Sequence, residues 1–75
     1  MTNSIQKTKP AAHSRYGHVL ASIWREEFGY SISLSRVYTD ANNRRHYSRS
    51  FFVEDIVSII LCLHSAHSKI DDLTK

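Results

Sequence analysis

The sequence predicts an α+β domain in which an antiparallel sheet is followed by one C-terminal helix. Residues 30–38 and 44–52 alternate in side-chain character, as half-buried strands do, and a turn rich in Asp and Asn separates them. Residues 53–70 instead place apolar side chains three and four residues apart, which is the spacing of an amphipathic helix. A chain of 75 residues has room for one such domain with a thin core.

The N-terminal part of the chain carries weaker signals. Residues 1–14 are polar and basic, and we expect them to form a disordered arm, which leaves residues 15–75 as a single small domain. Residues 15–28 fit two patterns: a helix with Leu20 and Trp24 on one face, or a strand in which apolar side chains alternate. Periodicity alone favours the helix for this segment.

Alternation assigns the hairpin side chains to faces. One face of residues 30–38 carries Tyr30, Ile32, Leu34, Arg36 and Tyr38. One face of residues 44–52 carries Arg45, Tyr47, Arg49 and Phe51. A shift of the register by one residue would exchange each set for the opposite one. Between the strands, residues 40–43 form the turn, because Asp and Asn tolerate left-handed backbone and bond their own main chain.

Charge divides the chain into a basic and an acidic part. Residues 1–52 carry eight Lys and Arg against three acids, a net charge of +5, whereas residues 53–75 carry two against four, a net charge of −2. A basic half beside an acidic half favours a surface for phosphate groups over ordinary solvated charge.

The predicted helix is too apolar for one that covers only its own sheet. Apolar residues widen its stripe beyond that of a simple surface helix, and a second copy of the chain is the simplest partner for the excess. We therefore expect a homodimer whose interface contains Ile56, Ile60, Leu63 and His67.

Several function classes find no support in the sequence. There is no glycine-rich phosphate loop and no nucleophile motif, so we expect neither enzymatic activity nor a cofactor. Cys62, His64 and His67 lie close together but lack the partners of a zinc site, so we expect no metal. The single cysteine and the absence of a long apolar run indicate a reduced, cytoplasmic protein that does not enter a membrane.

The hairpin combines arginines with aromatic rings. Arginines pair with phosphate oxygens, and aromatic rings stack on unpaired bases. The small serine side chains between them let a nucleic-acid strand lie close to the sheet. These residues predict an interface for single-stranded DNA or RNA, with the candidate residues Arg36, Arg44, Arg45, Arg49, Tyr30, Tyr38 and Tyr47.

Short motifs along residues 18–70 resemble a group of small bacterial proteins. The motifs are the run from Ser33 to Asp40, then Ser50-Phe51, then Glu54-Asp55-Ile56, and finally Ala66-His67. This group is similar to the core of positive cofactor four, a transcriptional coactivator that binds single-stranded DNA. The resemblance implies a curved antiparallel sheet of three to four strands that holds single strands, followed by one helix that pairs across a two-fold axis. It also implies that residues 18–26 are a strand, with the helix as the alternative.

The chain departs from this pattern at several positions. The turn has Asn42-Asn43 and no glycine, Phe52 occupies the expected helix N-cap, and Thr39 replaces a lysine. These departures leave room for a protein partner. The hairpin residues and the resemblance together nevertheless predict a small dimeric protein that binds single-stranded nucleic acid without sequence preference. The alternative is a protein-interaction module, such as a phage or mobile-element accessory factor or inhibitor that docks on a larger complex.

Overall fold

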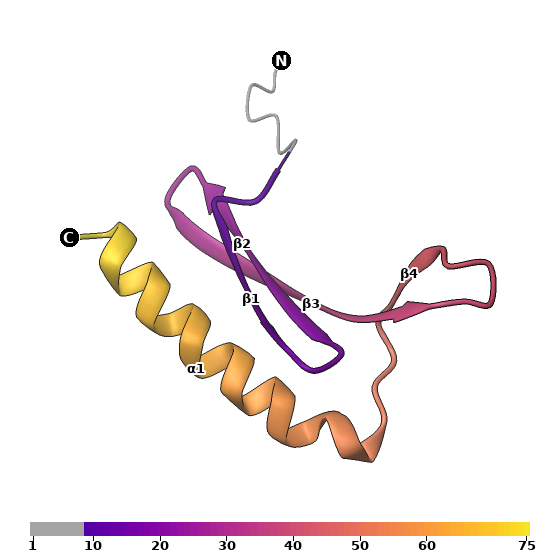
Figure 1. The fold of residues 1–75 in the computed structure, drawn as a ribbon. Coiled ribbons are helices and arrows are strands. Elements are labelled where there is room, and N and C mark those ends of the chain that lie inside the picture. Colours follow the sequence, from indigo (N-terminus) through magenta and orange to yellow (C-terminus); the bar gives the residue numbers. More distant parts are fainter. Residues whose placement is uncertain (1–8) are drawn as a thin grey trace.

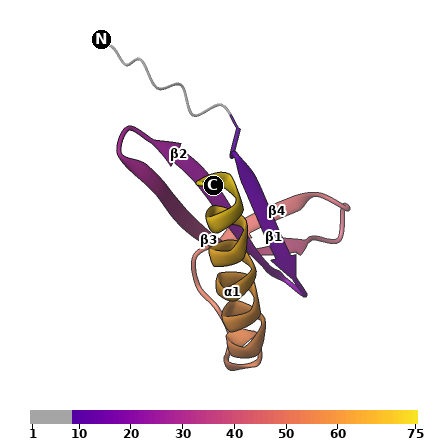
Figure 2. The same ribbon diagram turned by 90° about the vertical axis from the view of Figure 1, so that its left-hand side faces the viewer.

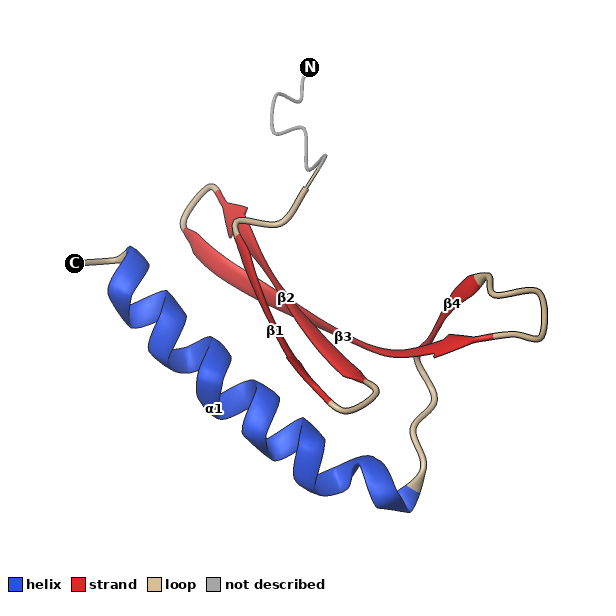
Figure 3. Ribbon diagram, viewed as in Figure 1, coloured by secondary structure: helices blue, strands red, loops and turns tan. Residues whose placement is uncertain are grey.

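The computed structural model describes residues 9–75 and confirms the predicted fold class (Figure 1). Four strands come first: β1 (Ala12–Tyr16), β2 (Val19–Glu26), β3 (Gly29–Thr39) and β4 (Arg45–Ser48). A short 3₁₀ turn, Val53–Asp55, then leads into the C-terminal helix α1 (Ile56–Leu73). All neighbouring strands are antiparallel, and their order in the sheet is their order in the chain (Figure 3).

Some element boundaries differ from those expected. Strand β1 begins at Ala12, so the expected end of the disordered arm at residue 14 is too late; residues 1–8 of that arm lie outside the described residues. The strand expected over 18–26 is confirmed as β2, and the helical alternative for this segment is wrong. Strand β4 is shorter than expected, and α1 continues three residues beyond position 70.

The core lies between α1 and the first two strands. Val19, Ala21 and Ile23 alternate along β2 and are fully buried, and they meet Cys62 and Ala66 of α1. Small side chains at the contact let the helix approach the sheet closely. Figure 2 shows α1 lying along one face of the sheet, and no element of residues 9–75 covers the other face.

Cys62 is a structural thiol within this core. Its Sγ lies 3.3 Å from the carbonyl oxygen of Val19, to which the thiol donates, and burial raises the pKa of the Cys62 thiol. A neutral thiol behaves as a small apolar side chain with one weak donor. This residue therefore belongs to the packing of α1 on β2.

Gly17 allows the tight turn between β1 and β2. Its φ of 57° lies in the left-handed region, where glycine is favoured. A Cβ at this position would also lie 3.2 Å from the Ser58 Oγ of α1. The turn and the helix can therefore approach each other closely.

Strand β3 is longer than its neighbours and continues beyond them. Within the described strands, Tyr38 and Thr39 of β3 pair with β4 alone. The β3–β4 hairpin projects away from the helix (Figure 1). We call residues 38–48 the hairpin arm.

An ion pair connects the base of this arm to the start of the helix. The Asp55 Oδ2 atom accepts hydrogen bonds from the Phe52 backbone N–H at 2.9 Å and from the Arg36 Nε–H at 2.8 Å. The Arg36 guanidinium also lies 4.6 Å from the centroid of the Phe52 ring. Asp55 is buried, so both of these bonds are partly shielded from water.

We expect this carboxylate to make stability depend on pH. The bond from the Phe52 N–H, followed by the bond and the positive charge of Arg36, lowers the pKa of Asp55 below its usual value. The stabilisation is therefore complete above the pKa of the unfolded chain, and it is lost as the pH falls through the lower pKa of the folded state. Urea unfolding should show a lower midpoint for Asp55→Asn at neutral pH. The same variant should also lose less stability than the wild type on acidification.

Glu54→Gln is the matched control, because Glu54 is an exposed acid next to Asp55. Its unfolding midpoint should follow that of the wild type at both pH values. Equal effects of the two substitutions would contradict a special role for Asp55.

Candidate nucleic-acid interface

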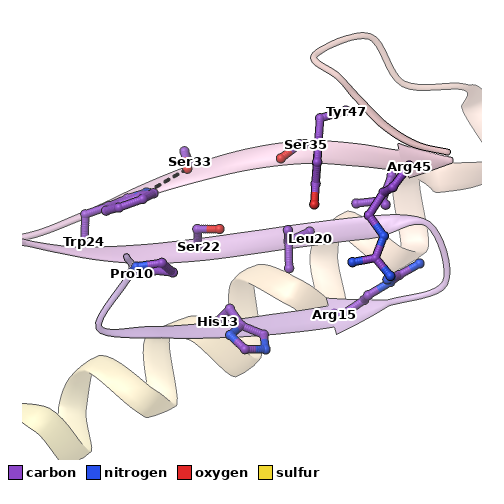
Figure 4. Close-up of a pocket in the computed structure, with 11 residues that line it drawn as sticks. Pro10, His13, Arg15, Leu20, Ser22, Trp24, Ser33, Ser35, Arg45 and Tyr47 are labelled. Carbon is purple, nitrogen blue, oxygen red and sulfur yellow. Dashed lines mark hydrogen bonds between the residues drawn. The ribbon is translucent and has the colours of Figure 1, made fainter. Parts of the chain in front are cut away.

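The sheet face opposite α1 forms a shallow groove, which we call the open face (Figure 4). Because directly paired residues of antiparallel strands point to the same side, the pairing of the strands identifies its members. These side chains come from all four strands and from Pro10, which precedes β1. The groove is lined by Pro10, His13, Arg15, Leu20, Ser22, Trp24, Ser33, Ser35, Val37, Arg45 and Tyr47.

Small side chains form the floor of the groove. Ser22 of β2 pairs with Ser33 of β3, and Leu20 pairs with Ser35 in the neighbouring row. Serine hydroxyls donate and accept hydrogen bonds and do not rise far above the sheet. An extended ligand could therefore lie close to the backbone of β2 and β3.

Trp24 stands at one end of the groove and is held in place. Its Nε1–H donates to the Ser33 Oγ at 2.9 Å, which fixes the orientation of the indole ring (Figure 4). The side chain remains partly exposed. A fixed ring with an accessible face is a stacking platform for a planar group.

Positive charge gathers at the other end of the groove. Arg15 and Arg45 reach this end from β1 and β4, and His13 lies between them and Trp24 along β1 (Figure 4). Arg15 Nε donates to the Gly17 carbonyl oxygen at 3.2 Å. Within residues 9–75, neither arginine forms an ion pair with a carboxylate. Two arginines without acidic partners attract an anion.

Asp40 organises the hairpin arm that carries Arg45 and Tyr47. Its carboxylate accepts hydrogen bonds from the backbone N–H groups of Asn42 and Arg44, both at 2.9 Å, and lies 2.7 Å from the His46 Nε2. The His46 bond is the main cause that lowers the pKa of Asp40. The His46 ring in turn stacks on Tyr38, with centroids 5.2 Å apart. These contacts give the arm a defined shape although it has little apolar core.

The structure divides the predicted interface residues between two faces. Arg45 and Tyr47 lie on the open face. Arg36 pairs with Ser48, and Tyr38 pairs with His46, so Arg36 and Tyr38 point to the helix side together with Tyr30. The expectation that all of these side chains form one surface is therefore wrong.

The three side chains on the helix side already have partners within the protein. Arg36 binds Asp55, Tyr38 stacks on His46, and Tyr30 packs against the core cluster. Arg44 lies in the loop of the arm and Arg49 follows β4, and both are exposed.

Three important members of the open face are not among the residues predicted from the sequence. His13 lies within the expected arm, although it belongs to the short strand β1. Arg15 and Trp24 lie in residues 15–28, a segment whose sequence also fits a helix. The alternation of His13 and Arg15 with Ala12, Ser14 and Tyr16 is the signal that identifies this strand.

The predicted dimer residues lie on one exposed flank of α1. Ile56, Ile60 and Leu63 expose 51%, 59% and 40% of their surfaces, and His67 follows them at helical spacing. No Asp, Glu, Lys or Arg occurs anywhere in residues 56–68. We call Ile56, Ile60, Leu63 and His67 the apolar flank.

Part of the sheet on the helix side also remains uncovered. Helix α1 packs against β1 and β2, and Ile32 of β3 exposes 39% of its surface. Ile32 therefore adds exposed apolar area on the side of the sheet that faces α1.

Residues 9–75 contain neither a metal-binding group of side chains nor a membrane-spanning helix. No group of three or more His, Cys, Asp or Glu side chains within residues 9–75 is arranged to hold a metal ion. In the same part of the chain, no helix is both long enough and apolar enough to cross a membrane.

Comparison of the chain with protein-family models, with curated proteins and with solved structures finds no match.

Proposed function

We propose that this protein binds single-stranded nucleic acid along its open face and that it acts as a homodimer in the cytoplasm without catalysing a reaction. One observation carries the proposal. Arg15 and Arg45 have no acidic partners in the described part of the chain, and they share a groove of small side chains with the partly exposed ring of Trp24.

The chemistry of the groove fits an unpaired strand better than a duplex. The rings of Trp24 and Tyr47 can bind a nucleic acid by stacking on the faces of its bases. Those faces are accessible only when the bases are not stacked within a duplex. The two arginines supply the positive charge that phosphates require. Stacking accepts every base, so this groove favours binding with little sequence preference.

The resemblance to the core of positive cofactor four supports the same proposal. In that family a curved antiparallel sheet holds single strands, and one helix follows it. Here, too, one face of the sheet has no covering element among the described residues, and this face carries cations and rings. The residues that would bind differ from those expected from the hairpin alone, because Tyr30, Arg36 and Tyr38 lie on the other side.

A second copy of the chain is the proposed partner of the apolar flank. A helix that is uncharged around its circumference over residues 56–68 is typical of a buried helix, yet this one has an exposed side. Since the flank carries no Asp, Glu, Lys or Arg, two copies can meet around a two-fold axis without repulsion between like charges. The thin core of a single chain gives the pairing an energetic reason.

We expect binding to fluorescently labelled oligothymidylate, measured by anisotropy, to weaken steeply as salt rises. Arg15→Gln and Arg45→Gln should each weaken binding and reduce the slope of log affinity against log salt by about 0.7, because each variant loses one phosphate contact with a single strand. The same titrations with a duplex of equal length should show weaker binding at every salt concentration.

Arg25→Gln is the charge-matched control. Arg25 is an exposed arginine of β2 that pairs with Tyr30 and therefore points away from the open face. If Arg25→Gln reduces the slope as much as Arg15→Gln does, binding is not localised to the groove. If the wild-type protein does not bind at low salt, the proposal fails and the protein-interaction module becomes the better explanation.

We expect Ile60→Asp to convert the dimer into a monomer. The substitution would place two carboxylates against each other in an apolar interface, where burying an unpaired charge is costly. Light scattering should report twice the chain mass for the wild type and the single chain mass for the variant. Phe28→Asp is the control, because Phe28 is 95% exposed in the β2–β3 turn, far from the flank in sequence. A monomeric wild type would overturn the dimer proposal.

A further inference from the structure

The open face is organised in successive rows across the sheet. One row contains Arg15, Leu20 and Ser35, because Leu20 pairs with both of the others. The next row along β2 contains His13, Ser22 and Ser33. Trp24 and Ser31 form the last row.

The spacing of these rows suits a nucleotide chain. Neighbouring rows are two residues apart along β2, which corresponds to about 7 Å. Successive phosphates of an unstacked single strand are separated by a similar distance. A strand that runs along β2 can therefore place one nucleotide over each row.

The two ends of the groove differ in charge. Arg15 and Arg45 lie at one end, with Tyr47 beside them (Figure 4). At the other end, Glu26 follows Trp24 on the same face of β2, and its carboxylate accepts a hydrogen bond from the Ser31 Oγ at 2.6 Å. The residues that line the groove end at Trp24, and Glu26 beyond it is engaged in contacts within the protein. The groove therefore has a defined end.

We infer that the groove holds about three nucleotides of a single strand per chain, a conclusion that rests on the proposed function. The base at one end stacks on Trp24. The next phosphates lie beside His13 and between Arg15 and Arg45. The base at the far end lies over Leu20 against the ring of Tyr47. The middle base meets only the hydroxyls of Ser22 and Ser33, which accept any base.

A length series of unlabelled oligothymidylates tests this footprint. Trp24 is the only tryptophan in the chain, so its fluorescence reports stacking directly. Quenching titrations at low salt with two, three, four and six nucleotides should show affinity rising roughly tenfold or more from two to three, since stacking of one base accounts for such a factor. The increase in affinity from three to four nucleotides should be only about two- to threefold. The fourth nucleotide makes no new contact and only allows the strand to bind in a second register.

Two variants separate the ends of the groove. Trp24→Leu should lose most of the gain between two and three nucleotides while keeping the salt slope, both measured by anisotropy with labelled oligonucleotides. Tyr47→Leu should lose a similar part of the same gain, because it removes the ring against which the base at the far end lies. Tyr16→Leu is the control, since Tyr16 pairs with Val19 and therefore points to the helix side.

The outcomes distinguish the footprint from the function. The inferred footprint is wrong if a twenty-nucleotide strand binds without quenching the fluorescence of Trp24. It is also wrong if affinity rises by the same factor for each nucleotide added between two and six. In both cases single-strand binding stands. If the twenty-nucleotide strand does not bind at low salt, both proposals are overturned.

Discussion

Close packing of α1 against β1 and β2 is the constraint on which the rest of the structure depends. Ala21 and Ile23 of β2 meet Cys62 and Ala66 of the helix, and all four side chains are fully buried. This contact fixes which side of the sheet is covered, and so it determines which side chains remain available to a ligand. Arg15 lines the open face, because its neighbours Ser14 and Tyr16 in β1 point to the helix.

The hairpin arm depends on polar contacts because the helix does not reach it. Asp40 closes the loop through its carboxylate, and the ion pair of Arg36 with Asp55 connects the base of the arm to the start of α1. These contacts place Arg45 and Tyr47 over the end of the groove (Figure 4). Of the arginines expected to bind phosphate, Arg36 thus has a structural role, whereas Arg45 lies on the open face.

The fold class could be predicted from the sequence because its signals are local. Alternation in β3 and the apolar periodicity of α1 are both visible in a short window. The composition of the candidate site could not be predicted, because it depends on the register between strands. Arg36 and Arg45 both alternate correctly within their own strands, but the pairing of Arg36 with Ser48 places them on opposite faces. Trp24 could be placed on the groove only after residues 15–28 were known to contain a strand.

The central claim is that one face of the sheet binds a single strand, and backbone amide chemical shifts test it most directly. We would titrate isotope-labelled protein with a short oligothymidylate and follow its amide resonances. The account predicts large shifts for the rows around Arg15, Ser22 and Ser33 and small shifts along the exposed side of α1. Shifts concentrated on α1, with an unchanged groove, would contradict it.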